Sequence, residues 1–234
     1  MRTMLTLGAT LVATLAAFRP SLAPAEDLAL ASLELGGAVT SLELGRSLTP
    51  LELGIVTEHN LARTDPRAYA DYLREFREFF DGNLIRIPGQ TAAVLTREGR
   101  GAVDEAIDFL MAVDPIQSLT TSEGMSRGAA DHVRDQGPAG GTGHDGSDGS
   151  TPGERIDRHG FWNMIFAENL AYGPDRARDV VMGLIIDDGV PDRGHRTNIF
   201  DPRLRIIGVA CGPHEVYRSM CVMDYAGEFT EGSP

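Results

Sequence analysis

Apolar and polar residues follow helical spacing through most of the first half of the chain. Thr49-Pro50-Leu51-Glu52 combines a capping threonine, a first-turn proline and a glutamate three residues after the cap, so a helix is predicted over 49–63. Asp65-Pro66 predicts the start of a second helix. The apolar stripe of that helix is expected to belong to the core: Tyr69, Tyr72, Leu73, Phe76 and Phe80.

The same spacing predicts three further helices, over 97–113, 120–136 and 175–186, the middle one capped near Thr121 or Ser122. A short helical turn is predicted over 154–162. The expected buried faces are Val103, Ile107, Leu110 and Met111 in the first of these helices, and Val180, Val181, Leu184 and Ile185 in the last.

The pattern changes to that of strands near the end of the chain. Residues 204–211 and 220–225 are rich in Val, Ile and Met, and a loop with Gly212-Pro213 joins them, which predicts a β-hairpin. Cys211 and Cys221 lie symmetrically about this loop. We therefore predict a cross-strand disulfide, provided that the protein reaches an oxidising compartment.

The first 25 residues have the features of a secretory signal peptide. Arg2 precedes an uncharged apolar run at 5–18, and Ala23-Pro24-Ala25 offers a cleavage pattern of small residues. The run is too short for a membrane-spanning helix, which needs about 20 residues, although a retained N-terminal anchor is the alternative. We expect a secreted or periplasmic protein that is not an integral membrane protein.

A nine-residue repeat follows the predicted signal peptide. Leu-Glu-Leu-Gly begins at Leu33, Leu42 and Leu51, and a period of nine keeps the leucines on one face of neither a helix nor a strand. Residues 26–48 are therefore predicted to form a loosely ordered arm or linker, with a partner-binding tether as the alternative. Residues 49–231 are predicted to form one domain around a single core.

The charge of the chain excludes one class of partner. The formal net charge is −13, and removal of 1–25 would take away Arg2 and Arg19 but no acid, which gives −15. A chain this acidic repels nucleic acid and anionic lipid surfaces.

Three polar islands between 143 and 198 contain the residues best suited to chemistry. They are Gly143-His144-Asp145-Gly146, Ala167-Glu168-Asn169-Leu170 and the segment from Asp192 to Asn198. Their key side chains, His144, Glu168 and His195, suit a zinc ion or proton exchange near neutral pH. Three unrelated surface loops are the alternative.

Other motifs have the wrong context. Gly124-Met125-Ser126-Arg127-Gly128 matches the serine-hydrolase pattern but lies in a predicted helix without a preceding strand. His214-Glu215 lacks the second histidine of a zinc-protease helix, and the loop from Asp145 to Gly149 lacks the length of an EF-hand. The remaining histidines are predicted to be structural: His59, His132, His159 and His214.

The sequence resembles the superfamily of cysteine-rich secretory proteins, antigen 5 and pathogenesis-related 1 proteins (CAP), in particular its bacterial SCP-like extracellular members. The resemblance covers about 58–229. Its motifs are His59-Asn60-Leu61-Ala62-Arg63, Gly143-His144, Ala167-Glu168-Asn169-Leu170-Ala171, Gly194-His195-Arg196-Thr197-Asn198-Ile199 and Ile207-Gly208-Val209-Ala210. It implies an α+β fold, namely a three-layer α-β-α sandwich with a central, mainly antiparallel sheet. The insertion between Phe80 and Arg97 has no counterpart in it.

The resemblance also implies a central cavity with two histidines and two acids, which holds zinc or another divalent ion in some members. His144, Glu168 and His195 match three of these positions. Asp187 takes the fourth, which is usually a glutamate three residues after a tryptophan; Leu184 stands at the tryptophan position, and Asp188 competes with Asp187.

A non-enzymatic secreted domain is the function that the resemblance favours. It would bind a small ligand of the lipid or sterol class, or a divalent metal ion with zinc as the first choice. One alternative is a metal-assisted hydrolase or peptidase with Glu168 as general base. A cell-envelope interaction or adhesion module, with its contact on the 26–48 arm, is the other alternative.

Overall fold

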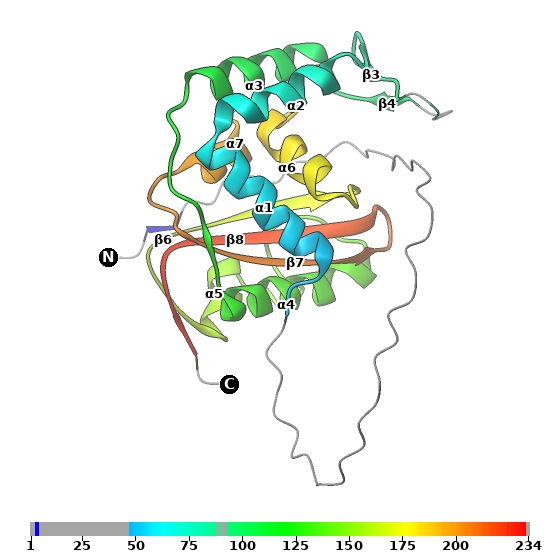
Figure 1. The fold of residues 1–234 in the computed structure, drawn as a ribbon. Coiled ribbons are helices and arrows are strands. Elements are labelled where there is room, and N and C mark those ends of the chain that lie inside the picture. The colour runs from blue at the N-terminus through cyan, green and yellow to red at the C-terminus, as the bar shows by residue number, and fades with distance from the viewer. Residues whose placement is uncertain (1–2, 5–46, 88, 90–92, 233–234) are drawn as a thin grey trace, which may run out of the picture.

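The computed structural model describes residues 3–4, 47–87, 89 and 93–232, and shows helices on both faces of a central sheet (Figure 1). The sheet has the strand order β1-β6-β8-β7-β5. Strand β8 is antiparallel to both of its neighbours, β6 and β7, whereas the short outer strands are parallel to theirs, β1 to β6 and β5 to β7. The strands are β1 (Thr3–Met4), β5 (Thr120–Thr121), β6 (Gly160–Tyr172), β7 (Ile206–His214) and β8 (Arg218–Glu231).

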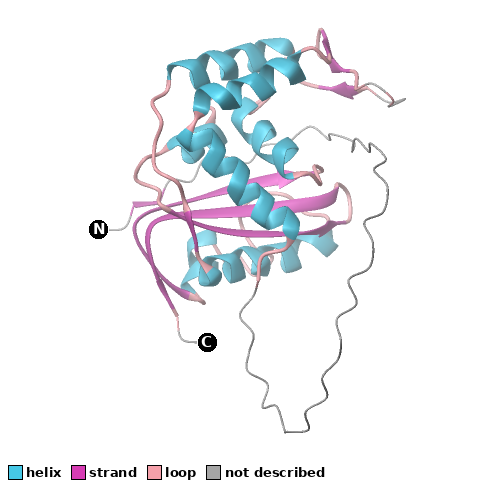
Figure 2. Cartoon of the chain, in the orientation of Figure 1, coloured by secondary structure: helices cyan, strands magenta, loops and turns pink. Residues whose placement is uncertain are grey.

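Two layers of helices enclose this sheet (Figure 2). The layer on one face consists of α1 (Pro50–Thr64), α2 (Pro66–Arg77), α3 (Arg100–Ala112), α6 (Ala177–Ile186) and α7 (Gly194–Phe200). The opposite layer consists of α4 (Glu123–Ala139) and α5 (Pro152–Asp157). The predicted three-layer sandwich with a mainly antiparallel sheet is confirmed.

The insertion between α2 and α3 forms a small separate sheet. Its antiparallel strands are β2 (Phe80–Asp81), β3 (Leu84–Ile85) and β4 (Val94–Leu95). The prediction that Phe80 belongs to the helical stripe is therefore wrong, because α2 ends at Arg77.

The long strand β6 is the largest difference from the sequence prediction. A helical turn was expected over 154–162, but α5 ends at Asp157 and β6 begins at Gly160. Most of β6 is buried between the two helical layers, so its sequence lacks the apolar-polar alternation that reveals a half-exposed strand.

Two further predictions need correction. Thr120–Thr121 is a strand, and the helix predicted over 120–136 begins after the cap Ser122 and continues to Ala139. Met111 was expected in the core, yet it is 39% exposed, because Val103, Ile107 and Leu110 are the residues of α3 that face inward.

The predicted hairpin forms, with a tighter turn than expected. Gly212-Pro213 was placed in the connecting loop, but both residues belong to β7, and the strands are joined after His214 and before Arg218. Cys211 and Cys221 are directly opposite each other in the β7–β8 register, and a disulfide links them, which confirms that prediction.

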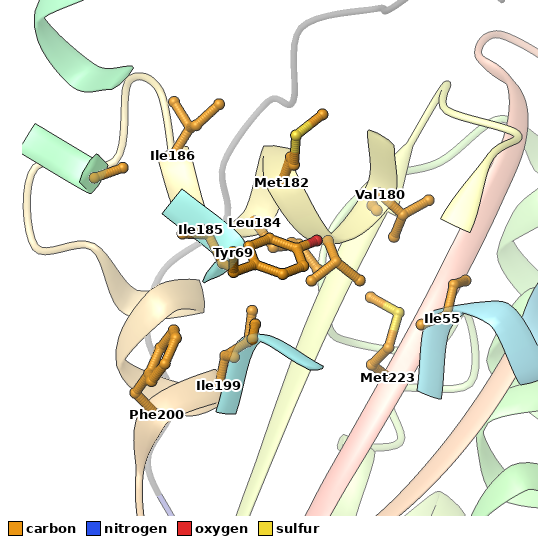
Figure 3. Packing of buried hydrophobic residues seen from close by; sticks show 14 of the residues in the cluster. Ile55, Tyr69, Val180, Met182, Leu184, Ile185, Ile186, Ile199, Phe200 and Met223 are labelled. Carbon is orange, nitrogen blue, oxygen red and sulfur yellow. The ribbon is translucent and has the colours of Figure 1, made fainter. Parts of the chain in front are cut away.

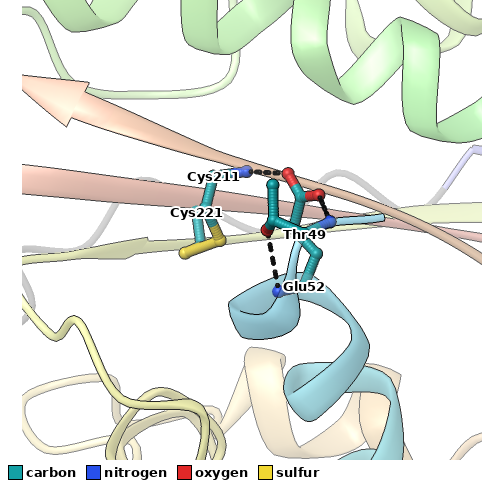
Figure 4. Close-up of a disulfide and its surroundings, with 4 residues drawn as sticks. All are labelled: Thr49, Glu52, Cys211 and Cys221. Atoms are coloured by element: carbon teal, nitrogen blue, oxygen red, sulfur yellow. Dashed lines mark hydrogen bonds between the residues drawn. A yellow bond between two sulfur atoms is a disulfide. The ribbon is translucent and has the colours of Figure 1, made fainter. Parts of the chain in front are cut away.

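The capping box at the start of α1 ties this helix to the hairpin (Figure 4). The Thr49 hydroxyl accepts a hydrogen bond from the Glu52 backbone, and Glu52 Oε2 accepts one from the Thr49 backbone. Glu52 Oε1 accepts a third hydrogen bond from the backbone N–H of Cys211, at 2.8 Å. One buried carboxylate therefore fixes the entry of α1 against the disulfide-bonded strand.

The main hydrophobic core lies between the sheet and the layer of α1, α2, α3, α6 and α7 (Figure 3). Leu184, which takes the tryptophan position of the family motif, is buried here next to Ile185 and Ile199. Smaller apolar clusters fill the space under α4 and α5. Close packing there requires Gly208, since a Cβ at this position would come within 2.3 Å of the Met125 backbone.

Two predicted segments lie outside the described residues apart from their edges. These are the signal peptide at 1–25, of which only Thr3–Met4 is described, and the arm at 26–48, of which only 47–48 are described. Among the helices of the described ranges, none is long and apolar enough to cross a membrane.

His59 is a buried histidine that should make stability depend on pH. Its Nδ1 donates to the Ile55 carbonyl and its Nε2 accepts from the Tyr225 hydroxyl at 2.7 Å, and burial lowers its pKa from 6.5 to about 4. Between these pH values the unfolded chain binds a proton that the folded chain excludes, so stability is complete above 6.5 and falls as the pH decreases. We expect a loss of about 3 kcal/mol by pH 4 from this residue.

Urea unfolding at pH 7 and pH 4.5 measures this loss. His59→Gln should have a lower free energy of unfolding at pH 7 but a smaller further decrease on acidification than the wild-type protein. His159→Gln, which changes a more exposed histidine, is the control. Equal decreases in the wild-type protein and His59→Gln would contradict the prediction.

Candidate functional site

Strand β6 carries two adjacent polar residues that point to opposite faces of the sheet. Glu168 shares a face with Phe166 and Leu170, which pack in the clusters under α4 and α5. Asn169 lies on the other face, where its side chain donates to the Tyr225 hydroxyl at 3.2 Å. The residues predicted to form the site are therefore divided between the two sides of one strand.

On the α4–α5 side, Glu168 lies between a histidine and an arginine. Its Oε1 accepts a hydrogen bond from Nδ1 of His144 at 2.7 Å, and its Oε2 accepts one from Nη2 of Arg155 at 2.8 Å. The Glu168 and Arg155 side chains are 2% and 3% exposed, whereas His144 is 18% exposed. Arg155 also donates to the Ser150 carbonyl, so α5 and the preceding loop hold its guanidinium.

Asp224 lies beside Glu168 as its register partner on β8. The Asp224 side chain is buried, and its Oδ1 has no hydrogen-bond partner among the described residues. Burial raises the pKa of Asp224 well above its usual range, and the neighbouring charge of Glu168 raises it further.

Three side chains position the loop that carries His144 by holding Gly143. Nε2 of His132 and the side-chain amide of Gln136 both donate to the Gly143 carbonyl, at 2.9 and 2.8 Å. The Gly143 N–H donates to the Tyr172 hydroxyl, which in turn donates to Gln136. Both backbone groups of the residue before His144 are therefore fixed by α4 and β6.

A polar cavity of about 390 Å³ lies next to this cluster and shares Arg155 with it. Its wall is formed by charged and hydroxyl side chains: Asp131, Arg134, Asp135, Ser147, Asp148, Ser150, Arg155 and Arg158. Such a wall suits the polar part of a ligand and not a hydrocarbon body.

On the opposite side of β6, His195 pairs with Asp187. Asp187 Oδ1 accepts from Nδ1 of His195 at 2.6 Å, and Oδ2 accepts from the His195 backbone at 2.9 Å. Asp187 ends α6 in the left-handed conformation, which turns its carboxylate toward the first residues of α7. Arg193 supports this turn by donating to the Asp187 carbonyl and pairing with Glu98 and Glu105 of the α3 region.

The structure separates the roles of the two adjacent aspartates. Asp188 accepts hydrogen bonds from the backbone N–H groups of Arg97 and Glu98, at 2.8 and 2.7 Å. Its carboxylate therefore caps the segment before α3, and Asp187 is the residue that contacts the histidine.

Asn169 connects the second pair to strand β6. Its side-chain amide donates to the His195 carbonyl at 3.1 Å, and its oxygen accepts from the Asn198 amide at 2.8 Å. Asn169 and Asn198, which both lie in the sequence motifs, thus hold α7 against the sheet.

The four predicted residues form two histidine–carboxylate pairs, and within the described chain no hydrogen bond or ion pair joins one pair to the other. All four carboxylate oxygens are already hydrogen-bonded, which leaves the two imidazole Nε2 atoms as candidate metal ligands. Zinc sites use three or four protein ligands, and no group of three His, Cys, Asp or Glu among the described residues is arranged to hold a metal ion. The geometry of the two pairs therefore does not test whether the protein binds a metal ion, and metal binding stays a prediction.

The sequence pattern did not predict Arg155 and Asp224 as residues of the site. The signal for Asp224 is a single acid within the apolar strand Cys221-Val222-Met223-Asp224-Tyr225. No local signal marks Arg155, since its partner is 13 residues away on a strand that was not predicted.

Ser126, at the centre of the serine-hydrolase pattern, has a structural role. Its hydroxyl donates to the Ser122 carbonyl and accepts from the Val209 backbone, which joins α4 to β7. It is buried in the first turn of α4, whereas a nucleophile would have to stand on the turn between β5 and α4 itself.

Comparison with known proteins identifies the class. Residues 58–225 match the model of the cysteine-rich secretory protein family (CAP). This match spans more than half of the chain, so the protein belongs to the CAP family, as its motifs predicted.

Two solved structures from bacteria are similar to part of the chain. One is an extracellular protein with an SCP domain from Bacillus anthracis, with 17% identity and a TM-score of 0.39 over 54% of this chain and 37% of that chain. The other is an outer surface protein from Borrelia burgdorferi, with 19% identity and a TM-score of 0.41 over 47% of this chain and 78% of that chain. The chain thus spans little more than a third of the Bacillus protein. No curated protein matches it.

Proposed function

We propose that the protein is an exported, non-enzymatic CAP domain that binds a hydroxyl-bearing small ligand of the lipid or sterol class, with the imidazoles of His144 and His195 as the candidate hydrogen-bond acceptors. The observation that carries this proposal is the orientation of both imidazoles. An ionised carboxylate can only accept hydrogen bonds, so the contacts to Glu168 and Asp187 require the proton on Nδ1 of each ring. In the neutral imidazole, each Nε2 then has a lone pair that can accept a hydrogen bond from a ligand hydroxyl.

Export is supported by the predicted signal peptide and by the disulfide between Cys211 and Cys221. Structural disulfides form and persist in oxidising compartments. Localisation outside the cytoplasm is therefore part of the proposal.

A divalent cation is the second candidate ligand, because the same two lone pairs suit it. Carboxylate-oriented imidazoles are typical of metal-binding histidines. A hydrolase with Glu168 as general base has less support, because both Glu168 oxygens already accept hydrogen bonds.

Titration calorimetry with a sterol and with its hydroxyl-methylated ether tests the proposal. We expect the sterol to bind and the ether to bind about tenfold more weakly, as expected for one lost hydrogen bond. The single sterol hydroxyl can donate to one Nε2 only, so His144→Ala, which removes the more exposed imidazole, should weaken sterol binding by a similar factor and His195→Ala should weaken it less. His159→Ala, which changes a histidine paired with Asp131, should leave it unchanged.

A parallel titration with Zn²⁺ separates the two candidates. Absence of sterol binding, or sterol binding that neither histidine variant weakens, would overturn the lipid proposal. Zn²⁺ binding lost in both histidine variants would then favour the second candidate.

A further inference from the structure

Asp224 is a buried acid that lies directly beside Glu168. The two residues face each other across β6 and β8 on the side covered by α4 and α5. Asp224 is 1% exposed, and its Oδ1 lacks a partner in the described part of the chain. A buried acid in this position requires a physical explanation, because an isolated buried charge is costly.

Hydrogen-bond chemistry restricts how the two acids can coexist. Both side chains are buried on the same face, and two ionised carboxylates are both acceptors, so a hydrogen bond between them requires that one of them carries a proton. Glu168 already accepts from Arg155 and from His144, and this arrangement suits the ionised form. The proton therefore belongs on Asp224.

The charge balance gives the same assignment. Arg155 is the cation that pairs with Glu168, and its guanidinium offsets one negative charge. A second ionised carboxylate in the same buried space would have no counter-charge. Asp224 thus lies beside a glutamate whose charge is already paired with an arginine.

We propose that Asp224 is a positioning residue of the binding site: as a neutral carboxylic acid, it donates a hydrogen bond to Glu168 and holds that carboxylate against Nδ1 of His144. Asp224 does not contact the ligand. It acts through Glu168, which keeps the His144 proton on Nδ1 and so leaves the Nε2 lone pair for the ligand. The effect on ligand binding rests on the proposed function, whereas the effect on the imidazole does not.

Nitrogen NMR of the His144 ring tests this role, because the two ring nitrogens report which of them carries the proton. Asp224→Asn keeps the shape and supplies an N–H donor, so it should retain the Nδ1-protonated form and bind the sterol within about twofold of the wild-type protein. Asp224→Ala removes the donor, so the population of that form should fall at least twofold and sterol binding should weaken several-fold.

Val222→Ala is the matched control, since Val222 is a buried residue on the same face of β8. It should lower stability without changing the His144 ring. The proposal is overturned if folded Asp224→Ala has the wild-type ring spectrum, or if Asp224→Asn changes that spectrum. The second outcome decides the question even if Asp224→Ala does not fold.

The ring spectrum also separates this inference from the proposed function. Loss of the Nδ1-protonated form in Asp224→Ala, in a protein that binds no sterol, would support the positioning role and reject only the ligand. Normal sterol binding with an unchanged ring in Asp224→Ala would reject the positioning role alone.

Discussion

Replacement of Arg155 by methionine is expected to lower the free energy of unfolding by about 3–5 kcal/mol. This is the usual cost of removing one partner of a buried ion pair and leaving the charge of the other uncompensated. Methionine fills much of the same volume but leaves the charge of Glu168 without its cation, next to Asp224. The Ser150 carbonyl also loses a donor. Urea unfolding at pH 7 measures the change.

The control for this experiment is Arg158→Met. Arg158 pairs with Asp148, and both side chains are largely exposed, so its loss should cost less than about 1 kcal/mol. Glu168→Gln introduced into Arg155→Met should restore part of the stability, because it removes the uncompensated charge. A cost below 1 kcal/mol for Arg155→Met, or no rescue by Glu168→Gln, would show that the pair contributes little.

Arg63→Met is expected to have a second effect of about 3–5 kcal/mol, through hydrogen bonds to the backbone. The Arg63 side chain, near the end of α1, is buried and donates to the carbonyls of Gln117, Ile199, Asp201 and Leu204. Each buried carbonyl left without a donor costs about 1–3 kcal/mol. Chemical unfolding compares this variant with Arg67→Met, which changes an exposed arginine of α2.

Arg63→Lys distinguishes charge from hydrogen-bond geometry at this position. Burial lowers the pKa of Arg63 to about 10, so the guanidinium remains charged at neutral pH. A lysine keeps the charge but cannot reach several carbonyls with a planar fork. We expect Arg63→Lys to remain at least 2 kcal/mol less stable than the wild-type protein; full stability would attribute the effect to charge alone.

Local signals in the sequence were sufficient for most helices and for the hairpin. The capping box at Thr49, the break at Asp187 and the cysteine symmetry each depend on residues near one another in the chain, and the structure has all three. Strand β6 was not predicted because most of it is covered on both faces, a condition that arises only when distant elements pack on it.

The two histidines and their acids were identified through family motifs, but their arrangement in two pairs was not. That arrangement depends on the direction of each side chain in β6 and on the left-handed turn at Asp187. Arg155 and Asp224 depend on the pairing of β6 with β8, which local sequence does not determine. The choice between Asp187 and Asp188 likewise depended on the position of the segment before α3.

The opposite directions of Glu168 and Asn169 link the site to the accuracy of folding. A slip of β6 by one residue would turn Glu168 toward α7 and Asn169 toward Arg155, because side chains alternate along a strand. The slip would break both the hydrogen bond between Glu168 and His144 and the hydrogen bond from Asn169 to the His195 carbonyl. Misfolded chains with this error should therefore lack both halves of the site, and occupancy of the site would report on the correct register of β6.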